Sequence, residues 1–302
     1  MLGIATHSAL DSAVIYDEVS LCEPICDEDT GATTVHTDVL MHVQNRFAQE
    51  MCLLRIQWRM LLFCFIIDVY GTLMLFRNLA FYRFRAGPRL TQDLGFDVLP
   101  EWRGCWTDSP MLALQIALLS ASIMCFVPRR RCPAPFVVNI WRRCAMMVAM
   151  GNILRFITYI STTLPGSAEH CLPSNPNIGK DQPKTVRDVL LRITVDIPGF
   201  NSSYGSSGTY NCGDLTFSGH ILLAMTLAFC CVRYVPHAFM MTASIESWFK
   251  RWVWATVVIQ CIFTIMARNH YTMDVVISLY LTPLLWSFYT TKMEPGDVQP
   301  TR

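Results

Sequence analysis

The chain has 302 residues, of which 52% are hydrophobic and only 16% are charged. A soluble domain carries about 25% charged residues, so this composition argues against a water-soluble enzyme and against a disordered chain. The 24 Lys and Arg residues nearly balance the 23 Asp and Glu residues, which leaves a net charge of +1. No basic field is therefore expected to attract nucleic acid. The composition predicts a multi-pass membrane protein.

The first 45 residues differ from the rest of the chain because they contain acidic residues but no Lys or Arg. This pattern predicts a polar, disordered cytosolic tail. Cys22 and Cys26 lie within it, but no second ligand pair follows at zinc-finger spacing, so we expect no metal site. The predicted organisation is a tail over residues 1–45, a membrane domain over 46–292 and a short cytosolic tail over 293–302.

Six stretches of the chain are apolar enough to cross a bilayer, each near the ~20 residues that a spanning helix needs. Tryptophans cluster near their ends, as interfacial aromatic residues do. Their approximate ranges are 58–76, 111–127, 144–164, 217–235, 252–267 and 271–290. The predicted fold class is an all-α membrane protein with six transmembrane helices.

Arginine placement predicts the orientation of these helices, because short cytosolic links are enriched in Lys and Arg. Arg129, Arg130 and Arg131 crowd the link between the second and third stretches, which places this link and both termini in the cytosol. The link after the first stretch also carries arginines, but acidic residues lie beside them. The lumenal side then receives the long loop over residues 165–216.

Two features of this long loop fit an oxidising, lumenal compartment. Asn201 begins an Asn-Ser-Ser sequence, which is a candidate glycosylation acceptor. Cys171 and Cys212 could pair as a disulfide there, although the residues alone leave two free thiols equally open.

Ionisable side chains inside or at the edges of membrane spans are costly, so each is a candidate functional residue. Four stand out: Arg155, His220, His270 and Asp274. With six spans and cytosolic termini, the end of the third span and the starts of the fourth and sixth face the lumen. The topology therefore predicts that Arg155, His220 and His270 converge on the lumenal face, at a candidate active site.

The spacing of these residues suggests phosphate chemistry. His270 and Asp274 are four residues apart, on one face of a helix, and a carboxylate beside an imidazole can present one ring nitrogen as a base or nucleophile. His220 follows Ser218 and Gly219 at a helix start, where backbone N–H groups and the helix dipole favour a phosphate oxygen. Two histidines and an arginine around such a helix start predict phosphoryl transfer on a lipid headgroup.

Arg155 has two interpretations that its position leaves open. It could clamp the oxygens of a phosphate, or it could act as a structural residue that pairs with Asp68 of the first span. No motif surrounds Asp68, so we expect it to pair with a polar neighbour inside the bundle.

Two motifs in the chain resemble those of the sphingomyelin synthases and related sphingolipid synthases. The stretch Cys212–His220 closely resembles their Cys-Gly-Asp-x-x-Phe-Ser-Gly-His motif, and the sequence that starts at His270 resembles their His-Tyr-Thr-x-Asp-Val motif. Residues 155–158, followed by 162–165, resemble the stretch before their long lumenal loop, and a weaker match covers residues 93–100. Together the matches extend from about residue 45 to residue 290.

The resemblance implies a six-span enzyme related to the lipid phosphate phosphatases, with His220, His270 and Asp274 as the catalytic triad. Such enzymes move a phospho-alcohol headgroup from a glycerophospholipid to ceramide and release diacylglycerol, so these lipids are the implied partners. The implied location is the Golgi or another secretory membrane, with a lumenal active site. No metal or cofactor is required, and a homo-oligomer remains open.

The headgroup is the least determined part of this prediction. Phosphocholine is the first expectation from the overall resemblance, and phosphoethanolamine and phosphoinositol are the alternatives. Arg268 lies two residues before His270, where a cation would disfavour choline and suit an inositol head, but it could equally face lipid phosphates at the interface. Tyr204, Tyr210 and Tyr271 could instead form a cation–π wall for choline.

Two other functions are compatible with parts of the sequence. A lipid phosphate phosphatase would use water as the acceptor, but its Lys-x6-Arg-Pro segment is missing, since the chain contains no Arg-Pro dipeptide. A non-catalytic ceramide sensor or transporter could retain the scaffold. A transporter would often show an internal repeat, which is not evident here, and the two histidines with their acid argue against a degenerate binder.

Overall fold

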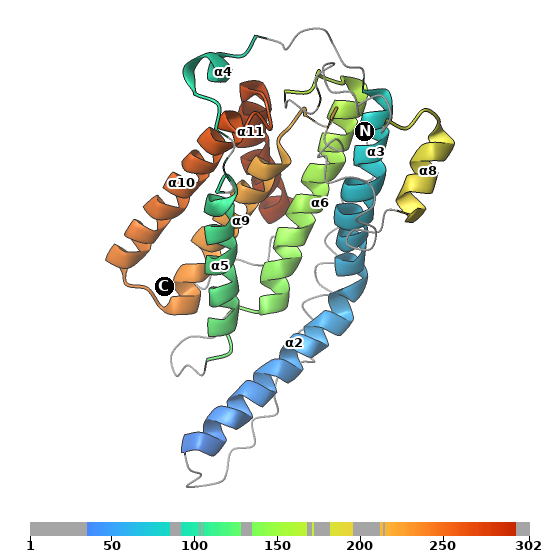
Figure 1. Ribbon diagram of the computed structural model, residues 1–302. Coiled ribbons are helices and arrows are strands. Elements are labelled where there is room, and N and C mark those ends of the chain that lie inside the picture. The colour runs from blue at the N-terminus through green and yellow to red at the C-terminus, as the bar shows by residue number, and fades with distance from the viewer. Residues whose placement is uncertain are drawn as a thin grey trace, which may run out of the picture.

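A computed structural model describes residues 35–84, 92–102, 104, 106–127, 135–167, 171, 182–195, 212–213 and 215–293. Within these ranges the secondary structure consists of helices, with no strand. The helices pack into an elongated bundle from which the first helix, α2, extends at one end (Figure 1). The all-α part of the predicted fold class is confirmed.

Six long helical segments of the described chain form the bundle. The first is continuous through α2 (Val35–Phe65), the π-helical η1 (Ile66–Phe76) and α3 (Arg77–Arg83). The others are α5 (Ser109–Met124), α6 (Val137–Ser161), α9 (Gly219–Phe239), α10 (Ala243–Met266) and α11 (Thr272–Phe288), which continues into η4 (Tyr289–Met293). Two short helices, α4 (Leu94–Val98) and α8 (Val186–Val195), lie in the connections.

Each predicted apolar stretch overlaps one of these segments, but several boundaries differ. Helix α10 begins at Ala243 rather than near residue 252. The extra turns mix polar and apolar residues and include an ion pair between Lys250 and Glu246 (2.7 Å), so an apolar stretch does not mark them. By length and composition, α6, α9 and α10 could each cross a membrane, and α5 is a shorter apolar helix. The count of six spans and their orientation stay predictions.

The N-terminal boundary also differs from the expected one, because α2 begins at Val35, inside the predicted tail. Glu50 accepts hydrogen bonds from the N–H groups of Val137 (2.7 Å) and Val138 (3.0 Å) at the start of α6. Arg46 donates to the carbonyl of Pro135 (2.7 Å). These contacts anchor a polar part of the helix to the bundle, so its ordering depends on tertiary structure.

Several sequence-based expectations fall outside the described residues, and the structure does not address them. They concern the tail with Cys22 and Cys26, the Arg129–Arg131 cluster, Asn201, Tyr204, Tyr210 and the C-terminal residues 294–302.

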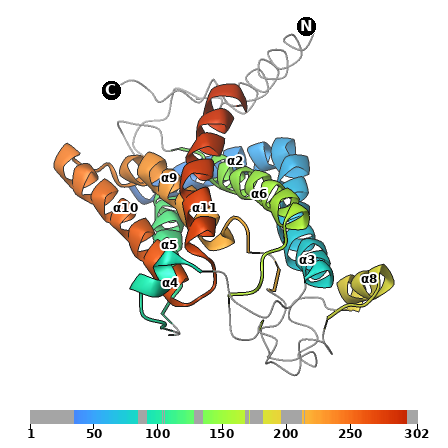
Figure 2. The ribbon, with the colours of Figure 1, turned by 90° about the horizontal axis from the view of Figure 1, so that it is seen from above.

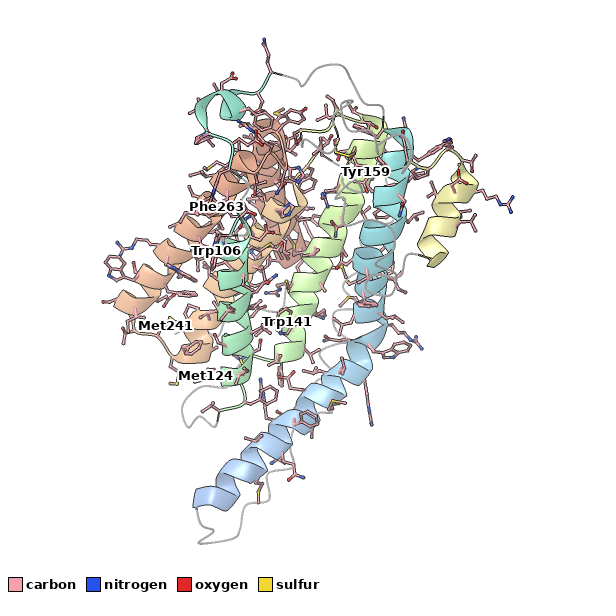
Figure 3. All side chains as sticks on the ribbon, viewed as in Figure 1. Trp106, Met124, Trp141, Tyr159, Met241 and Phe263 are labelled. Atoms are coloured by element: carbon pink, nitrogen blue, oxygen red, sulfur yellow. A yellow bond between two sulfur atoms is a disulfide. The ribbon has the colours of Figure 1, made fainter. Side chains whose placement is uncertain are left out.

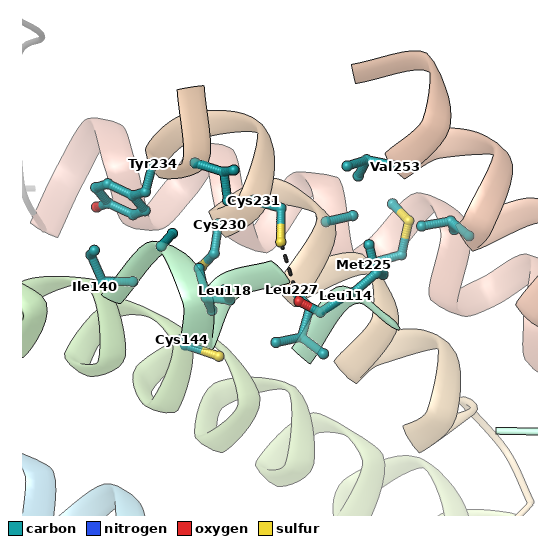
Figure 4. Close-up of a cluster of buried hydrophobic side chains, with 14 of the residues drawn as sticks. Leu114, Leu118, Ile140, Cys144, Met225, Leu227, Cys230, Cys231, Tyr234 and Val253 are labelled. Atoms are coloured by element: carbon teal, nitrogen blue, oxygen red, sulfur yellow. Dashed lines mark hydrogen bonds between the residues drawn. The ribbon is translucent and has the colours of Figure 1, made fainter. Parts of the chain in front are cut away.

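The main hydrophobic core surrounds α9. Seen from above, α9 lies among α5, α6, α10 and α11 (Figure 2). Leu114 and Leu118 of α5 are fully buried against it, and the Cys231 thiol donates to the Leu114 carbonyl at 3.5 Å (Figure 4). Cys144 and Cys230 are also buried in this core, where a thiol packs as a small apolar group. The helix that carries His220 is therefore held on all sides.

Most helices of the bundle begin or end at the end where α4 lies. Helices α5, α9 and α11 begin there, α3, α6 and α10 end there, and α4 lies across it (Figures 1 and 2). In Figure 3, Trp106, Tyr159 and Phe263 lie toward this end, and Met124, Trp141 and Met241 lie toward the other. We call the first the α4 end. It is the end that the sequence predicts to be lumenal.

Candidate active site

The two histidines singled out by sequence lie side by side at the α4 end. His220 is the second residue of α9, and His270 precedes the first residue of α11 by two positions. Their ring centroids are 5.7 Å apart, with the planes inclined at 70°. The His220 side chain is 34% exposed and that of His270 is 6% exposed. One imidazole is therefore open to solvent and the other is held inside the protein.

A backbone carbonyl determines the tautomer of His270. Its Nδ1 lies 3.0 Å from the carbonyl oxygen of Leu215. A carbonyl can only accept a hydrogen bond, so Nδ1 carries the proton and the neutral ring has its lone pair on Nε2. Sequence reasoning missed this contact, because a main-chain group 55 residues away leaves no side-chain signal.

Asp274 supports the same ring less directly than the sequence suggested. Its Oδ2 lies 3.6 Å from His270 Nδ1 and accepts a hydrogen bond from the N–H of Tyr271 at 3.0 Å. The carboxylate is fully buried. It therefore caps its own helix beside the imidazole, while the Leu215 carbonyl orients the ring.

His220 has an acidic neighbour that sequence reasoning missed. The Oδ1 of Asp108 lies 3.9 Å from His220 Nε2, and the Asp108 side chain is 56% exposed. Asp108 directly precedes α5, so its position at the start of the second apolar stretch is the signal that could have placed it at this end. The carboxylate and the imidazole therefore lie within ion-pair distance.

Arg155 and Asp68 are joined through a third residue. The Arg155 Nη1 donates to Asn152 Oδ1 at 3.2 Å, and Asn152 Nδ2 donates to Asp68 Oδ1 at 3.1 Å. The expectation that Asp68 pairs with a polar neighbour is therefore confirmed, and that neighbour is Asn152. The direct pairing of Arg155 with Asp68 is replaced by this bridge.

The guanidinium of Arg155 lies against the first turn of α9. Its Nε donates to the carbonyl of Phe217 at 2.7 Å, a residue held at a φ of 72°, which costs about 1–2 kcal/mol for a non-glycine residue. A Cβ on Gly219 would lie 2.6 Å from Nη1 and 2.8 Å from Cζ of Arg155. Only glycine allows this approach, which brings a positive charge to the helix N-terminus that carries His220.

Ser218 is a helix cap with no exposed surface. Its Oγ accepts from the N–H of Ile221 at 3.5 Å, and its own N–H donates to the carbonyl of Asp274 at 3.3 Å. Ser278 Oγ donates to the carbonyl of Ser218 at 3.2 Å. The structure thus uses Ser218 to join the start of α9 to α11.

The two candidate specificity residues, Arg268 and Tyr271, are engaged by neighbouring segments. Arg268 Nη2 donates to the carbonyls of Phe96 (3.0 Å) and Leu99 (3.2 Å), and the guanidinium lies 4.2 Å from the centroid of the Phe96 ring. The Tyr271 hydroxyl donates to the carbonyl of Pro165 at 3.0 Å. Arg268 therefore holds α4, and Tyr271 holds the segment that follows α6.

The structure joins Cys171 and Cys212 through a disulfide with a Cα–Cα distance of 5.6 Å. The pair is buried with Phe81 and Phe84 at the end of α3. It secures the chain just before Leu215. Asp214, within the first motif, lies outside the described residues.

Comparison with known proteins finds similarity that includes this site. Residues 211–291, which include both histidines, match the PAP2 superfamily C-terminal family. A phosphatidylinositol:ceramide inositolphosphotransferase of Oryza sativa subsp. japonica is 29% identical over 261 residues, which is 85% of this chain and 72% of that protein. The chain is therefore similar to sphingolipid synthases over most of its length.

Other relatives in the sphingolipid synthase family show how far the similarity extends. Phosphatidylinositol:ceramide inositolphosphotransferase 3 of Arabidopsis thaliana is 29% identical over 215 residues, 70% of this chain and 67% of that protein. Phosphatidylcholine:ceramide cholinephosphotransferase 1 of Rattus norvegicus is 29% identical over 153 residues, 50% of this chain and 33% of that protein. All of these relatives are named as ceramide phosphotransferases, and the similarity to the plant proteins covers more of the chain.

Proposed function

We propose that this protein transfers a phospho-alcohol headgroup from a glycerophospholipid to the primary hydroxyl of ceramide and releases diacylglycerol. The observation that carries the proposal is the pair of imidazoles at 5.7 Å, of which His270 has its lone pair on Nε2. The buried Arg155 lies against the first turn of α9, which carries His220. This arrangement supplies a nucleophile, a proton donor and an anion site around one position.

In the first half-reaction, His270 Nε2 attacks the phosphorus of the donor lipid. A nitrogen–phosphorus bond forms, the bond from phosphorus to the diacylglycerol oxygen breaks, and protonated His220 gives its proton to that oxygen. The imidazole becomes positively charged while it carries the phosphoryl group. The Leu215 carbonyl at 3.0 Å and the Asp274 carboxylate at 3.6 Å would stabilise that charge.

In the second half-reaction, ceramide replaces diacylglycerol. Neutral His220 removes the proton from the ceramide hydroxyl, whose oxygen attacks phosphorus as the bond to His270 breaks. The electron pair returns to Nε2, and His220 is again protonated for the next cycle. Asp108, 3.9 Å from His220 Nε2, would hold the protonated state between turnovers.

Phosphate charge would be offset at the start of α9. The Arg155 guanidinium lies under Gly219, and the N–H groups of the first helical turn add the positive end of the helix dipole. Such preorganised donors stabilise the charge that develops on the phosphoryl oxygens in the transition state.

We infer that inositol phosphate is the transferred headgroup, in place of the first expectation of phosphocholine. The support is the extent of similarity: the plant proteins named as inositolphosphotransferases match 85% and 70% of the chain, and the rat cholinephosphotransferase matches 50%. Arg268 adds no support, because its guanidinium contacts α4.

The proposed setting is a secretory membrane such as the Golgi, with six spans over residues 46–292, cytosolic termini and a lumenal α4 end. The disulfide between Cys171 and Cys212 at this end supports an oxidising compartment. Protease protection of tags at either terminus in sealed microsomes tests the orientation, and loss of both tags without detergent supports it.

A lipid assay tests the function. Purified protein receives labelled ceramide with an equimolar mixture of phosphatidylinositol, phosphatidylcholine and phosphatidylethanolamine, and mass spectrometry identifies the products. We expect a ceramide-dependent inositol phosphoceramide product and equal release of diacylglycerol. A phosphorylated product in which water is the acceptor, formed equally without ceramide, would instead identify a phospholipase-type hydrolase.

A further inference from the structure

Asp93 is a half-buried link between two segments that are far apart in sequence. Its Oδ2 accepts from the N–H of Thr272 at 2.8 Å, and its Oδ1 accepts from the Thr272 hydroxyl at 2.6 Å. The same Oδ1 accepts from the N–H groups of Gly95 (3.0 Å) and Phe96 (3.2 Å), which begin α4. One carboxylate therefore caps α4 and binds the first residue of α11, 179 residues later.

Helix α11 depends on this external carboxylate at its start. The first N–H groups of a helix have no partner within the helix, and the residue at the capping position is Tyr271, which lacks a short polar side chain. Asp274 takes the N–H of Tyr271, and Asp93 takes the N–H of Thr272. A carboxylate at this position is also stabilised by the helix dipole.

The segment over residues 93–102 packs along the turn between α10 and α11 at further points. Arg268 donates to the carbonyls of Phe96 and Leu99. Trp102 donates its N–H to the carbonyl of Met266 at 2.9 Å. A Cβ on Gly95 would collide with the Thr272 hydroxyl. This turn, which carries His270, is thus clamped between α4 and the helix bundle.

The first turn of α11 is also in contact with the other half of the active site. The carbonyl of Asp274 accepts from the N–H of Ser218 at 3.3 Å, and Ser218 caps the helix that begins with Gly219 and His220. A shift of the first turn of α11 would therefore move His270 and Asp274 directly and would loosen the start of α9.

We propose that Asp93 is a positioning residue of the active site: by binding Thr272 it fixes the first turn of α11 and keeps the His270 ring in line with His220. Asp93 acts through Thr272 and touches no reacting atom. The inference rests on the proposed function for its kinetic consequences. Its structural consequence, an ordered turn over residues 268–275, does not depend on which reaction is catalysed.

The variants Asp93→Ala, Asp93→Asn and Thr272→Val test the link, with Asp97→Ala as the matched control. Asp97 lies on the same short helix and is exposed. Asparagine keeps an oxygen for the three Oδ1 hydrogen bonds but turns an amide N–H₂ toward the N–H of Thr272. Valine keeps the shape of Thr272 and removes its hydroxyl.

We expect Asp93→Ala to lower kcat about 100-fold, the scale of a 1 Å misplacement, with KM for ceramide within about twofold, because in this proposal Asp93 acts through Thr272 and not on ceramide. Asp93→Asn should lower kcat about tenfold, which is the effect expected from the loss of one charge-assisted hydrogen bond. Asp97→Ala should behave as wild type. In the double variant Asp93→Asn/Thr272→Val the losses should be less than multiplicative, since both changes break one link.

Hydrogen exchange of the peptide over residues 268–275 provides a readout that is independent of activity. Faster exchange there in Asp93→Ala, with unchanged exchange in α9 beyond its first turn, supports the proposal. Unchanged kcat together with unchanged exchange in Asp93→Ala overturns the proposal. A change confined to KM also overturns it. So does global unfolding of both Asp93→Ala and Asp93→Asn. If wild type forms no ceramide product, the proposed function fails, and the exchange experiment still decides the role of Asp93.

Discussion

Two buried arginines on the same helix have different surroundings. Arg155, near the end of α6, is 5% exposed and donates to the carbonyl of Phe217 and to Asn152. Arg143, three turns earlier, is fully buried, and its guanidinium lies 5.7–5.8 Å from the ring centroids of Tyr234, Trp286 and Tyr289.

This difference shows that a buried arginine can have different roles at the two ends of the bundle. Aromatic faces stabilise the charge of Arg143 through cation–π contacts, which hold α6, α9 and α11 together. Arg155 lies instead at the helix N-terminus that carries His220, where a positive charge favours an anionic ligand. We therefore expect changes around Arg155 to reduce catalysis, and changes around Arg143 to reduce stability.

The largest contrast is expected between two histidines. His270→Ala removes the proposed nucleophile and should lower ceramide-dependent transfer by about 10⁴-fold or more, whereas His237→Ala, in the last turn of α9, should retain wild-type kcat. The measurement is product formation per folded protein, with folding checked by gel filtration. Robust product from His270→Ala would remove His270 from the mechanism.

The arginines themselves provide the second contrast. Arg155→Lys should lower kcat/KM about 100-fold, because a point charge cannot replace the planar donor set against the first turn of α9. Arg143→Lys should change kcat/KM less than threefold, about 0.7 kcal/mol, and should lower Tm. Measurements of kcat/KM and Tm for both variants under the same conditions test whether Arg155 mainly affects catalysis and Arg143 mainly affects stability. Equal kinetic losses would show that the two ends are not distinct.

A smaller effect is expected from an added methyl group at either of two neighbouring contacts between α6 and α9. Gly219→Ala forces the Arg155 guanidinium away and should lower kcat about tenfold, as the loss of one charged hydrogen bond would. In Gly151→Ala the three atoms nearest to the added Cβ all belong to the Leu222 side chain, which can change rotamer, so Tm should fall more than kcat. A normal kcat in Gly219→Ala would show that the position of Arg155 is unimportant.

The smallest effect on catalysis is expected from the disulfide. The double variant Cys171→Ser/Cys212→Ser opens a loop of 41 residues, for which the chain-entropy estimate is a loss of about 4 kcal/mol in the free energy of unfolding. Denaturant unfolding should detect this loss, while kcat at low temperature changes little because the histidines are held by other contacts. Unchanged stability with reduced kcat would assign the disulfide to the site instead.

Several parts of this arrangement could be predicted from the sequence. Alternating apolar stretches require the end of the third and the starts of the fourth and sixth to meet on one side, and the structure does bring Arg155, His220 and His270 to one end of the bundle. Asp68 could be expected to find a polar partner because an isolated charge inside an apolar bundle is costly.

Other parts could not be predicted because they depend on main-chain groups or on contacts between distant segments, which the order of side chains does not reveal. The carbonyl of Leu215 orients His270, and a carbonyl is common to every residue. Asp93 lies 179 residues from Thr272, in a connection whose path is decided by packing. The starts of α2 and α10 are stabilised by ion pairs and by hydrogen bonds to other helices, whereas apolar periodicity reports only the buried stretches.

The sequence by itself determined the all-helical class, the resemblance to a family and the pair of histidines at helix starts, because apolar length and short motifs are local properties of the chain. The tertiary structure alone decided which nitrogen of His270 carries the proton, that Arg155 lies under Gly219, and that Asp93 caps α11. The physical reason is that hydrogen bonds to main-chain groups and close backbone approaches depend on how distant segments pack, which no local pattern records.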